Sequence, residues 1–325
     1  MRAVVLRSHG GPEVLTIEEV PSPEPGPDQI LVDVAHTALN RADTLQRQGG
    51  YPDPRNLELE IPGLEYAGTV SAVGVGVTDW SVGDRVMGIE SGGCYAEQVV
   101  TYARQALPIP STVELKDAAA ISEVFLTAWD ALVVQGGLTS GRWALVHAGA
   151  SGVGTAAIQI AKAIGARIAV TCSAGKADAC RELGADLVLE RSPNDWLSDL
   201  EDAVPEGVDV VLDVVGGDEA DRNFRAVAMD ATIVQVGLMG GGSAPVNMGM
   251  LLMKRITWIG TTLRARPLER KLALCQRFRS EMIPLFESGA LRPVIDSRYA
   301  FDDVADAHRH MESNASIGKI LLDIA

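Results

Sequence analysis

A glycine-rich turn between an apolar strand and a helix constrains this chain more than any other segment. Residues 143–147 form a short apolar run, and the sequence then continues as Ala-Gly-Ala-Ser-Gly-Val-Gly up to Gly154. The run predicts a buried strand, and the apolar periodicity of residues 155–162 predicts a helix directly after the turn. Glycines at such a junction let the backbone approach a phosphate, which the helix N-terminus binds through its N–H groups. We therefore expect a dinucleotide-binding unit here.

The spacing of this turn departs from the usual dinucleotide fingerprint because a serine stands at the second glycine position. The expected phosphate contacts are Gly149, Ser151, Gly152, Val153 and Gly154. Ser151 is either a helix N-cap or a residue with a cofactor or catalytic role.

Apolar runs alternate with helical segments beyond the turn. Further runs occur at 168–171, 187–189, 208–215 and 232–236. Continuous Val, Ile and Leu runs of this kind predict a parallel sheet that is covered by helices on both faces. Ligands bind such sheets at the carboxyl ends of the strands.

The flanking sequence has a different texture, with short β-rich runs interrupted by Pro and Gly, which predicts a partly open β-barrel or sandwich. After a last long helix expected over 267–288, the C-terminal residues return to this texture. The length of 325 residues favours two domains. We expect a β-rich catalytic domain of residues 1–122 and 268–325, interrupted by a Rossmann domain of residues 123–267. The fold class is thus α/β.

The end of the second Rossmann strand predicts the kind of nicotinamide cofactor. NAD sites usually place a carboxylate there, against the ribose 2′-hydroxyl. This chain has none at that point, and instead provides Ser173 and Lys176, with Arg191 after the third strand. A hydroxyl and cations suit a 2′-phosphate, so we predict NADPH; the alternative is that Lys176 is a solvated residue of a first helical turn.

Other strand ends supply further candidates. The turn that contains Gly237, Leu238 and Met239 either flanks the nicotinamide or is a flexible loop. Leu263 and Arg264 end another apolar strand and are expected cofactor or substrate contacts. Two residues near the C-terminus either contact the cofactor or lie on the surface, Asn314 and Lys319.

Charge and hydropathy exclude several classes of function. A net charge of −15 argues against a nucleic-acid partner, which needs a basic face. No apolar stretch approaches the roughly 18 to 20 residues that a membrane span requires, and the N-terminus runs straight into a strand pattern without a signal peptide. The four cysteines have no paired spacing. We expect a cytoplasmic protein.

Motifs along nearly the whole chain resemble the zinc-free quinone oxidoreductases of the medium-chain dehydrogenase/reductase superfamily, especially the tumour-suppressor-induced branch of animals. They lie at residues 10–13, 39–43, 46–51, 62–65, 147–159, 237–242, 263–266 and 317–320. The resemblance implies a GroES-like catalytic domain, an inserted Rossmann domain, a cleft between them, and usually a homodimer. It also implies NADPH-dependent reduction of quinones and other conjugated carbonyls.

The same resemblance assigns residues to the two ends of the cofactor. Positions that line the nicotinamide in this family are Asn40, Tyr51, Thr127 and Ser151. Ser173, Lys176 and Arg191 fall on the 2′-phosphate pocket, although a tyrosine is common at the last position. The arginine keeps the 2′-phosphate pocket positively charged, and the contact with the adenine side of the cofactor is left open.

No metal is expected. The related zinc enzymes have Cys where this chain has Asn40 and His where it has Leu64, and no ligand spacing appears among the five histidines. Without zinc to stabilise an alkoxide, the substrate must already be electrophilic. We expect hydride delivery to a quinone or enone, with Tyr51 bonding the substrate oxygen or the carboxamide, or else forming a packed turn. Asn40 either holds the ribose or Tyr51, or shapes a turn.

Two other functions are compatible with these motifs. An enoyl or alkenal reductase that acts on the C=C bond of conjugated carbonyls shares all of them. A noncatalytic NADPH-binding protein, of the lens-crystallin or RNA-binding kind known in this family, fits less well with the acidic charge and with the retained Asn40, Tyr51 and Ser151.

Overall fold

The computed structural model describes residues 1–55, 58–191 and 195–324. The chain divides into two compact units. Unit 1 contains Met1–Glu123 and Leu263–Ala325, and unit 2 contains Val124–Thr262. Each unit is described by itself.

Unit 2 is built on six parallel strands in the order β10-β9-β8-β11-β12-β13. The strands are β8 (Trp143–Val146), β9 (Arg167–Cys172), β10 (Leu187–Glu190), β11 (Val208–Asp213), β12 (Val227–Gln235) and β13 (Thr257–Gly260). In chain order this is 3-2-1-4-5-6, the doubly wound arrangement of dinucleotide-binding sheets. The order in which the strands are added to the sheet reverses between β8 and β11. Sheets of this kind bind their ligand at that point.

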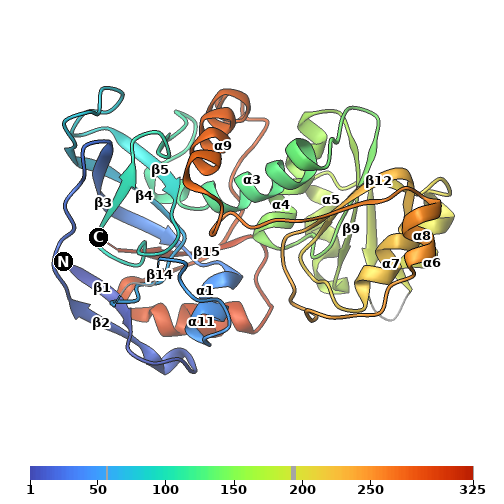
Figure 1. Ribbon diagram of the computed structural model, residues 1–325, viewed down its shortest axis with the longest axis horizontal. Helices are drawn as coiled ribbons and strands as arrows, with labels where there is room; N and C mark the ends of the chain where they lie inside the picture. Colours follow the sequence, from blue (N-terminus) through green and yellow to red (C-terminus); the bar gives the residue numbers. More distant parts are fainter. Residues whose placement is uncertain (56–57, 192–194, 325) are drawn as a thin grey trace. The chain divides into compact units, whose positions relative to one another are not determined.

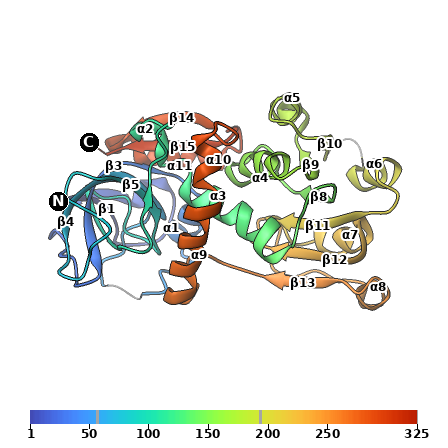
Figure 2. The same cartoon turned by 90° about the horizontal axis from the view of Figure 1, so that it is seen from above.

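Helices cover both faces of this sheet. They are α3 (Ser122–Trp129), a π-helical turn (Asp130–Gln135), α4 (Gly152–Ala163), a 3-10 turn (Ala174–Lys176), α5 (Ala177–Glu182), α6 (Trp196–Ala203), α7 (Glu219–Ala226) and α8 (Met248–Met253). Figure 2 shows α4 and α5 on one face and α6 and α7 on the other. Central strand residues such as Leu145 and Val211 are fully buried, as expected for a strand between two helical layers.

Unit 1 is β-rich. A seven-stranded sheet runs in the order β14-β15-β3-β4-β5-β7, with β6 also paired to β3, and β1 and β2 form a separate antiparallel hairpin. The strands are β1 (Arg2–Leu6), β2 (Leu15–Glu19), β3 (Gln29–Ala38), β4 (Glu65–Val73), β5 (Arg85–Ile89), β6 (Gln98–Tyr102), β7 (Leu107–Pro108), β14 (Ile295–Ala300) and β15 (Lys319–Asp323). Figure 1 shows the C-terminal strand β15 beside the N-terminal strand β3.

The helices of unit 1 are short, except for one. They are a 3-10 turn (Pro12–Val14), α1 (Arg41–Arg47), α2 (Leu115–Ala118), α9 (Leu268–Glu281), α10 (Ile283–Glu287), a 3-10 turn (Phe301–Asp303) and α11 (Val304–Glu312). The helix expected over 267–288 is therefore wrong as one piece, since it breaks at Met282. Pro284 lacks an N–H and its ring clashes with a carbonyl one turn earlier, so the helix restarts there.

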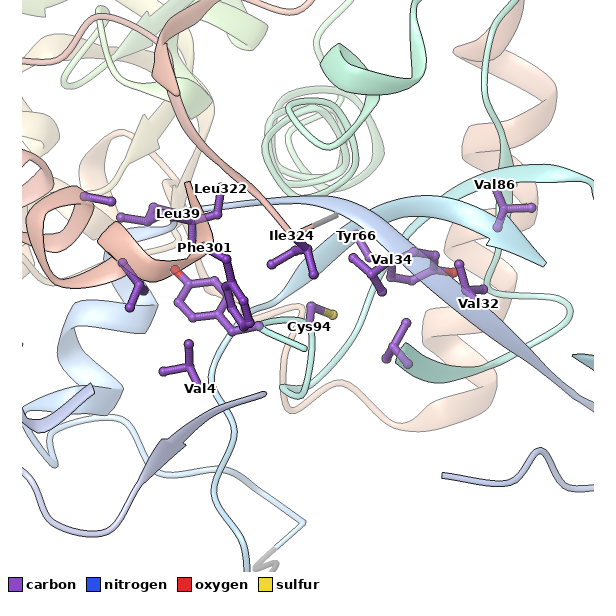
Figure 3. Packing of buried hydrophobic residues seen from close by; sticks show 14 of the residues in the cluster. Val4, Val32, Val34, Leu39, Tyr66, Val86, Cys94, Phe301, Leu322 and Ile324 are labelled. Atoms are coloured by element: carbon purple, nitrogen blue, oxygen red, sulfur yellow. The ribbon is translucent and has the colours of Figure 1, made fainter. Parts of the chain in front are cut away.

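The core of unit 1 joins both ends of the chain. Val32 and Val34 of β3 pack in one cluster with Leu322 and Ile324 from the C-terminal segment, together with Phe301 (Figure 3). Burial of such side chains stabilises by about 1.5–3 kcal/mol each. The C-terminal strand is thus an integral part of the unit that the N-terminal strands begin.

The second boundary between the units differs from the expected one. Residues 263–267 were expected at the end of the Rossmann domain, but they group with unit 1. The reason is Arg264, whose guanidinium donates hydrogen bonds to the backbone oxygens of Ser91 and Tyr51 and to the side chain of Gln46, all in unit 1.

Candidate active site

The turn between β8 and α4 requires glycine at two positions. A Cβ on Gly149 would lie 2.5 Å from the Cβ of Val170 in β9, and one on Gly154 would lie 2.4 Å from the carbonyl oxygen of Ala148. Ala148 itself has a left-handed backbone, with φ of 57°. The glycines therefore allow the turn to pack against β9 and to close on itself, a backbone geometry that would let a phosphate approach it.

Ser151 caps the helix that follows the turn. Its Oγ accepts a hydrogen bond of 3.0 Å from the N–H of Gly154. The N-cap role considered for Ser151 is therefore observed, and its cofactor or catalytic role stays a prediction. Among the described residues, the N–H groups of Gly152 and Val153 have no recorded acceptor, so they are the donors available to an anion at this positive end of α4.

A buried polar chain connects the strand ends behind this loop. His147 contacts Thr171 through Nδ1 at 3.0 Å and Asn223 through Nε2 at 2.8 Å. Asn223 in turn donates to Asp213, whose other carboxylate oxygen accepts from the N–H of Gly216. Each of these polar groups fills the hydrogen-bonding capacity of the next, and the chain of bonds holds the ends of β8, β9 and β11 in register.

Ser173, Lys176 and Arg191 gather at the ends of neighbouring strands. Ser173 follows β9 directly and its carbonyl accepts from the N–H of Lys176, while the N–H of Arg191 donates to the carbonyl of Cys172 at 3.0 Å. The structure therefore places the backbones of these three residues near one another at the ends of β9 and β10, and their contact with a 2′-phosphate stays a prediction. The carboxylate closest in sequence to these three residues is that of Glu190, which ends β10 and directly precedes Arg191.

The turn after β12 is fastened to the turn after β11. The N–H of Gly217 donates to the carbonyl of Gly241 at 3.0 Å, and the N–H of Gly240 donates to Val215 at 2.7 Å. Leu238 and Met239, between these anchors, are exposed. Gly237 begins the turn, with its carbonyl bound to the Gln235 amide. The three candidates therefore belong to an anchored turn with an exposed apolar tip.

In unit 1, Asn40 lies in a network with a buried ion pair. Its Nδ2 donates to Glu65 Oε1 at 2.9 Å, and its Oδ1 accepts from Lys319 Nζ at 2.7 Å. Lys319 is also 2.8 Å from Glu65 Oε1, and both side chains are buried. Asn40 additionally begins helix α1, where its N–H donates to Asp43. Its amide is thus fixed in orientation, and Lys319 contacts this network rather than lying on the surface.

Tyr51 lies against Arg264. The guanidinium stands 4.9 Å from the centre of the Tyr51 ring and donates to the Tyr51 carbonyl at 2.7 Å. The Tyr51 side chain is half-buried, and its hydroxyl has no hydrogen-bond partner within the described part of the chain. Burial, and then the charge of Glu123, raise the pKa of the phenol, while Arg264 opposes them. The ring is packed, as expected if residue 51 forms a packed turn, and the hydroxyl is available for a hydrogen bond to a ligand.

Three remaining candidates take other positions. Leu263 is buried in unit 1. Asn314 has a left-handed backbone, with φ of 56°, and its side-chain oxygen accepts from Arg41 at the exposed surface. Thr127 is half-buried in α3. A contact between any of these residues and a cofactor stays a prediction.

No three His, Cys, Asp or Glu side chains are grouped as metal ligands in the described ranges 1–55, 58–191 and 195–324. Within the same ranges, no helix has the length and apolar character needed to cross a membrane. The absence of a metal stays a prediction.

Comparison with known proteins identifies the family. Residues 26–111 match the model of the alcohol dehydrogenase GroES-like domain, and residues 152–277 match that of the zinc-binding dehydrogenases. The mouse quinone oxidoreductase-like protein 2 is 31% identical over 315 residues, which cover 95% of this chain and 89% of that protein. This chain belongs to the zinc-free quinone oxidoreductases of the medium-chain dehydrogenase/reductase superfamily. The predicted family is thereby confirmed.

Two further similarities come from other proteins. The rat synaptic vesicle membrane protein VAT-1 homolog is 31% identical over 340 residues, which cover 99% of this chain and 84% of that protein. The crystal structure of Escherichia coli quinone oxidoreductase complexed with NADPH has a TM-score of 0.90 at 30% identity and covers 100% of both chains. The predicted fold class, a GroES-like domain with a Rossmann-type parallel sheet, is confirmed.

Sequence reasoning missed two acidic residues of this oxidoreductase. Glu65 lies in one of the motifs that carry the resemblance, residues 62–65, but was not singled out as a site residue, and neither was Glu123. In the structure, Glu65 accepts from Asn40, from Lys319 and from the N–H of Glu123. A carboxylate that follows an apolar proline–glycine–leucine segment was the available signal for Glu65; for Glu123, the signal was a carboxylate at the start of an apolar helix.

Proposed function

We propose that this protein reduces quinones and related conjugated carbonyls with NADPH. The observation that carries the proposal is the phosphate loop at α4 together with the group of Ser173, Lys176 and Arg191 at the ends of β9 and β10. The N–H groups of Gly152 and Val153 would bind the pyrophosphate, and the second group would bind the 2′-phosphate. When bound, the reduced nicotinamide supplies a hydride.

The residues of unit 1 support an activated acceptor as the substrate. The Tyr51 hydroxyl, which has no partner among the described residues, would donate to a carbonyl oxygen, and the packed guanidinium of Arg264 would hold the ring in place. Asn40, held by Glu65 and Lys319, would present a fixed amide. A quinone or enone accepts a hydride without a Lewis acid, since the added charge spreads onto its own oxygen.

The direct test follows the absorbance of reduced nicotinamide with NADPH and NADH across a panel of quinones, enones and alkenals. We expect turnover of quinones with a preference for NADPH. Faster turnover of alkenals than of 1,2-naphthoquinone would favour a C=C reductase. Tight cofactor binding without oxidation by any acceptor would favour a noncatalytic NADPH-binding protein.

Lys176→Ala is expected to raise the KM for NADPH by about 10- to 100-fold and to leave the KM for NADH unchanged. The reason is the loss of a charge-assisted hydrogen bond to the 2′-phosphate, which contributes about 1.5–3 kcal/mol. Lys162→Ala is the matched control, because Lys162 lies in the same unit and pairs with Asp186 at 2.7 Å. Equal loss of affinity for both cofactors would contradict a 2′-phosphate contact.

Tyr51→Phe is expected to lower kcat with a good quinone by about 5-fold or more, since a neutral hydrogen bond that strengthens in the transition state contributes at least ~1 kcal/mol. The ring and its contact with Arg264 are retained, so stability should change little. Tyr102→Phe in β6 serves as the control. Unchanged turnover would remove the hydroxyl from the chemistry.

A homodimer and a cytoplasmic location are further parts of the proposal. For the dimer, β13 is an edge strand of the six-stranded sheet, and Trp258 in it is 42% exposed. An exposed apolar edge strand is a template for pairing with another chain. Light scattering of the purified protein would measure the mass of the assembly.

A further inference from the structure

The side-chain amide of Asn40 is held between a cation and a carboxylate, both of them buried. Its Oδ1 accepts from Lys319 Nζ at 2.7 Å, and its Nδ2 donates to Glu65 Oε1 at 2.9 Å. Lys319 is 3% exposed and Glu65 is fully buried, so water does not compete for these contacts. An ammonium only donates and an ionised carboxylate only accepts. The two partners therefore favour one orientation of the amide.

The opposite orientation would bring like groups together. Rotation of the amide by 180° would place its NH₂ group against the ammonium of Lys319 and its oxygen against the carboxylate of Glu65. Two favourable contacts would become two repulsive ones in a place that water does not reach. The orientation of the Asn40 amide is therefore set by strands β4 and β15, which carry these two side chains.

The protons of the amide are already used inside the protein. Nδ2 donates to Glu65 and also faces the carbonyl oxygen of Ala38 at 3.4 Å. The N–H of Asp43, in the first turn of α1, binds the main-chain oxygen of Asn40 at 2.9 Å. Asn40 is only half-buried, and a carbonyl oxygen can take a further donor beside Lys319. The group that the Asn40 side chain can offer to a ligand is thus an acceptor, not a donor.

Lys319 has no proton left for a ligand. Its Nζ contacts the carbonyl oxygen of Leu39 at 2.6 Å, Asn40 Oδ1 at 2.7 Å and Glu65 Oε1 at 2.8 Å, and an ammonium has three protons. The side chain is also buried. Lys319 would therefore act on a ligand through Asn40 and not by direct contact.

We propose that Asn40 binds a hydroxyl or N–H group of the ligand through Oδ1, and that Lys319 is the positioning residue that fixes this polarity. The inference rests on the proposed function and names the kind of group that Asn40 recognises. The carbonyl of a quinone or enone has no proton to donate, so it is excluded as the partner of Asn40. The donors in the proposed reaction are the carboxamide N–H and the ribose hydroxyls of the nicotinamide nucleoside, and the hydroxyls of the hydroquinone product.

Calorimetric titration of Asn40→Leu measures this contact without turnover. Leucine has nearly the shape of asparagine without its polar atoms, and the pair of Glu65 and Lys319 is retained. We expect about 5-fold weaker binding of the ligand that carries the donor, the usual effect of one neutral hydrogen bond. Adenosine 2′,5′-bisphosphate, which has neither the nicotinamide nor its ribose, should bind as it does to the parent protein. Gln276→Leu is the matched control, since it removes an amide from α9 in the same unit.

Three probes distinguish the sources of the donor. The 3-acetylpyridine analogue of NADPH keeps the ribose and replaces the carboxamide nitrogen by a methyl group. If the carboxamide is the donor, Asn40→Leu should lose affinity for NADPH and not for the analogue. If the ribose is the donor, the two should lose affinity alike. If the product is the donor, the hydroquinone of 1,2-naphthoquinone, kept under argon, should bind more weakly and NADPH should not. Each of these results supports the proposal.

A double-mutant cycle tests the role of Lys319. Lys319→Met should weaken binding of the same ligand by about 3- to 5-fold, and it should add nothing to the loss in Asn40→Leu, because Lys319 acts through Asn40. Additive losses would overturn the positioning role. If circular dichroism shows that Lys319→Met is unfolded, the neutral combination of Glu65→Gln with Lys319→Met takes its place. A glutamine at position 65 both donates and accepts, so it no longer fixes the amide.

Three results would overturn the role of Asn40 as an acceptor. They are unchanged affinity of Asn40→Leu for every probe, weaker binding of 1,2-naphthoquinone itself, which would show donation to a carbonyl, and weaker binding of adenosine 2′,5′-bisphosphate, which would show a general structural effect. Failure of the proposed function is seen separately. If NADPH does not bind, both are wrong. If NADPH binds and no quinone or enone oxidises it, the reductase activity alone is wrong, because the affinities still report on Asn40.

Discussion

Lys319→Met is expected to lower the free energy of unfolding by about 3–5 kcal/mol, the usual cost of leaving a buried charge without its partner. Glu65 is completely buried and Lys319 is 3% exposed, so water cannot replace the lost ammonium. The substitution also removes a donor from Asn40 and from the carbonyl of Leu39. Urea unfolding followed by circular dichroism measures the change.

The matched controls are Glu65→Gln and the double variant of Glu65→Gln with Lys319→Met. The double variant carries no unpaired charge at this place, so it should be more stable than Lys319→Met alone, with an interaction free energy that a double-mutant cycle isolates. Additive losses from the two single changes would show that the pair is not coupled. Hydrogen exchange of β3, β4 and β15 locates the destabilised region.

Gly154→Ala is expected to weaken NADPH binding by about 10- to 100-fold. The new Cβ would lie 2.4 Å from the Ala148 oxygen and 2.5 Å from the carbonyl of Gly149, both of which are backbone atoms that cannot rotate away. Relief of such a clash costs about 1–3 kcal/mol, which corresponds to this loss of affinity at about 1.4 kcal/mol per tenfold. Calorimetric titration with NADPH measures it.

Gly260→Ala is the control for this experiment. Gly260 ends β13 in the same unit, and a Cβ there would meet nothing within 4 Å. It should bind NADPH as the parent protein does. If Gly154→Ala also binds normally, the turn between β8 and α4 is not the phosphate site.

The sequence was most informative where a local pattern decides local structure. The apolar run of β8, the glycines that follow it and the periodicity of α4 act within some twenty residues, and the missing carboxylate after β9 needed no tertiary information. The parallel sheet followed from repetition of that unit. The break at Met282 was missed because apolar periodicity continues across it, and only the steric effect of Pro284 interrupts the helix.

The unit 1 site was harder to predict because its parts are distant in the sequence. Asn40, Glu65 and Lys319 meet only through pairing of β3 with β4 and β15. Arg264 was expected to contact the cofactor or the substrate because it ends a strand pattern, whereas its bonds to Gln46, Ser91 and Tyr51 arise from packing that no local pattern encodes. The contact between Glu65 and the N–H of Glu123 likewise joins residues that are distant in the sequence, so it is a property of the assembled unit.

The pairing of β15 with β3 has a consequence for the order of events during synthesis on the ribosome. Unit 2 is contiguous and has all its strands once residue 262 has emerged, whereas Glu65 has to wait for Lys319. Domains fold as their chain emerges, at about 5–20 residues per second. Unit 2 should therefore be complete while residues 1–123 of unit 1 still lack β15. During that time the edge of β3 is unpaired and the carboxylate of Glu65 has no cation beside it. For that interval, nascent unit 1 is a natural client for chaperones.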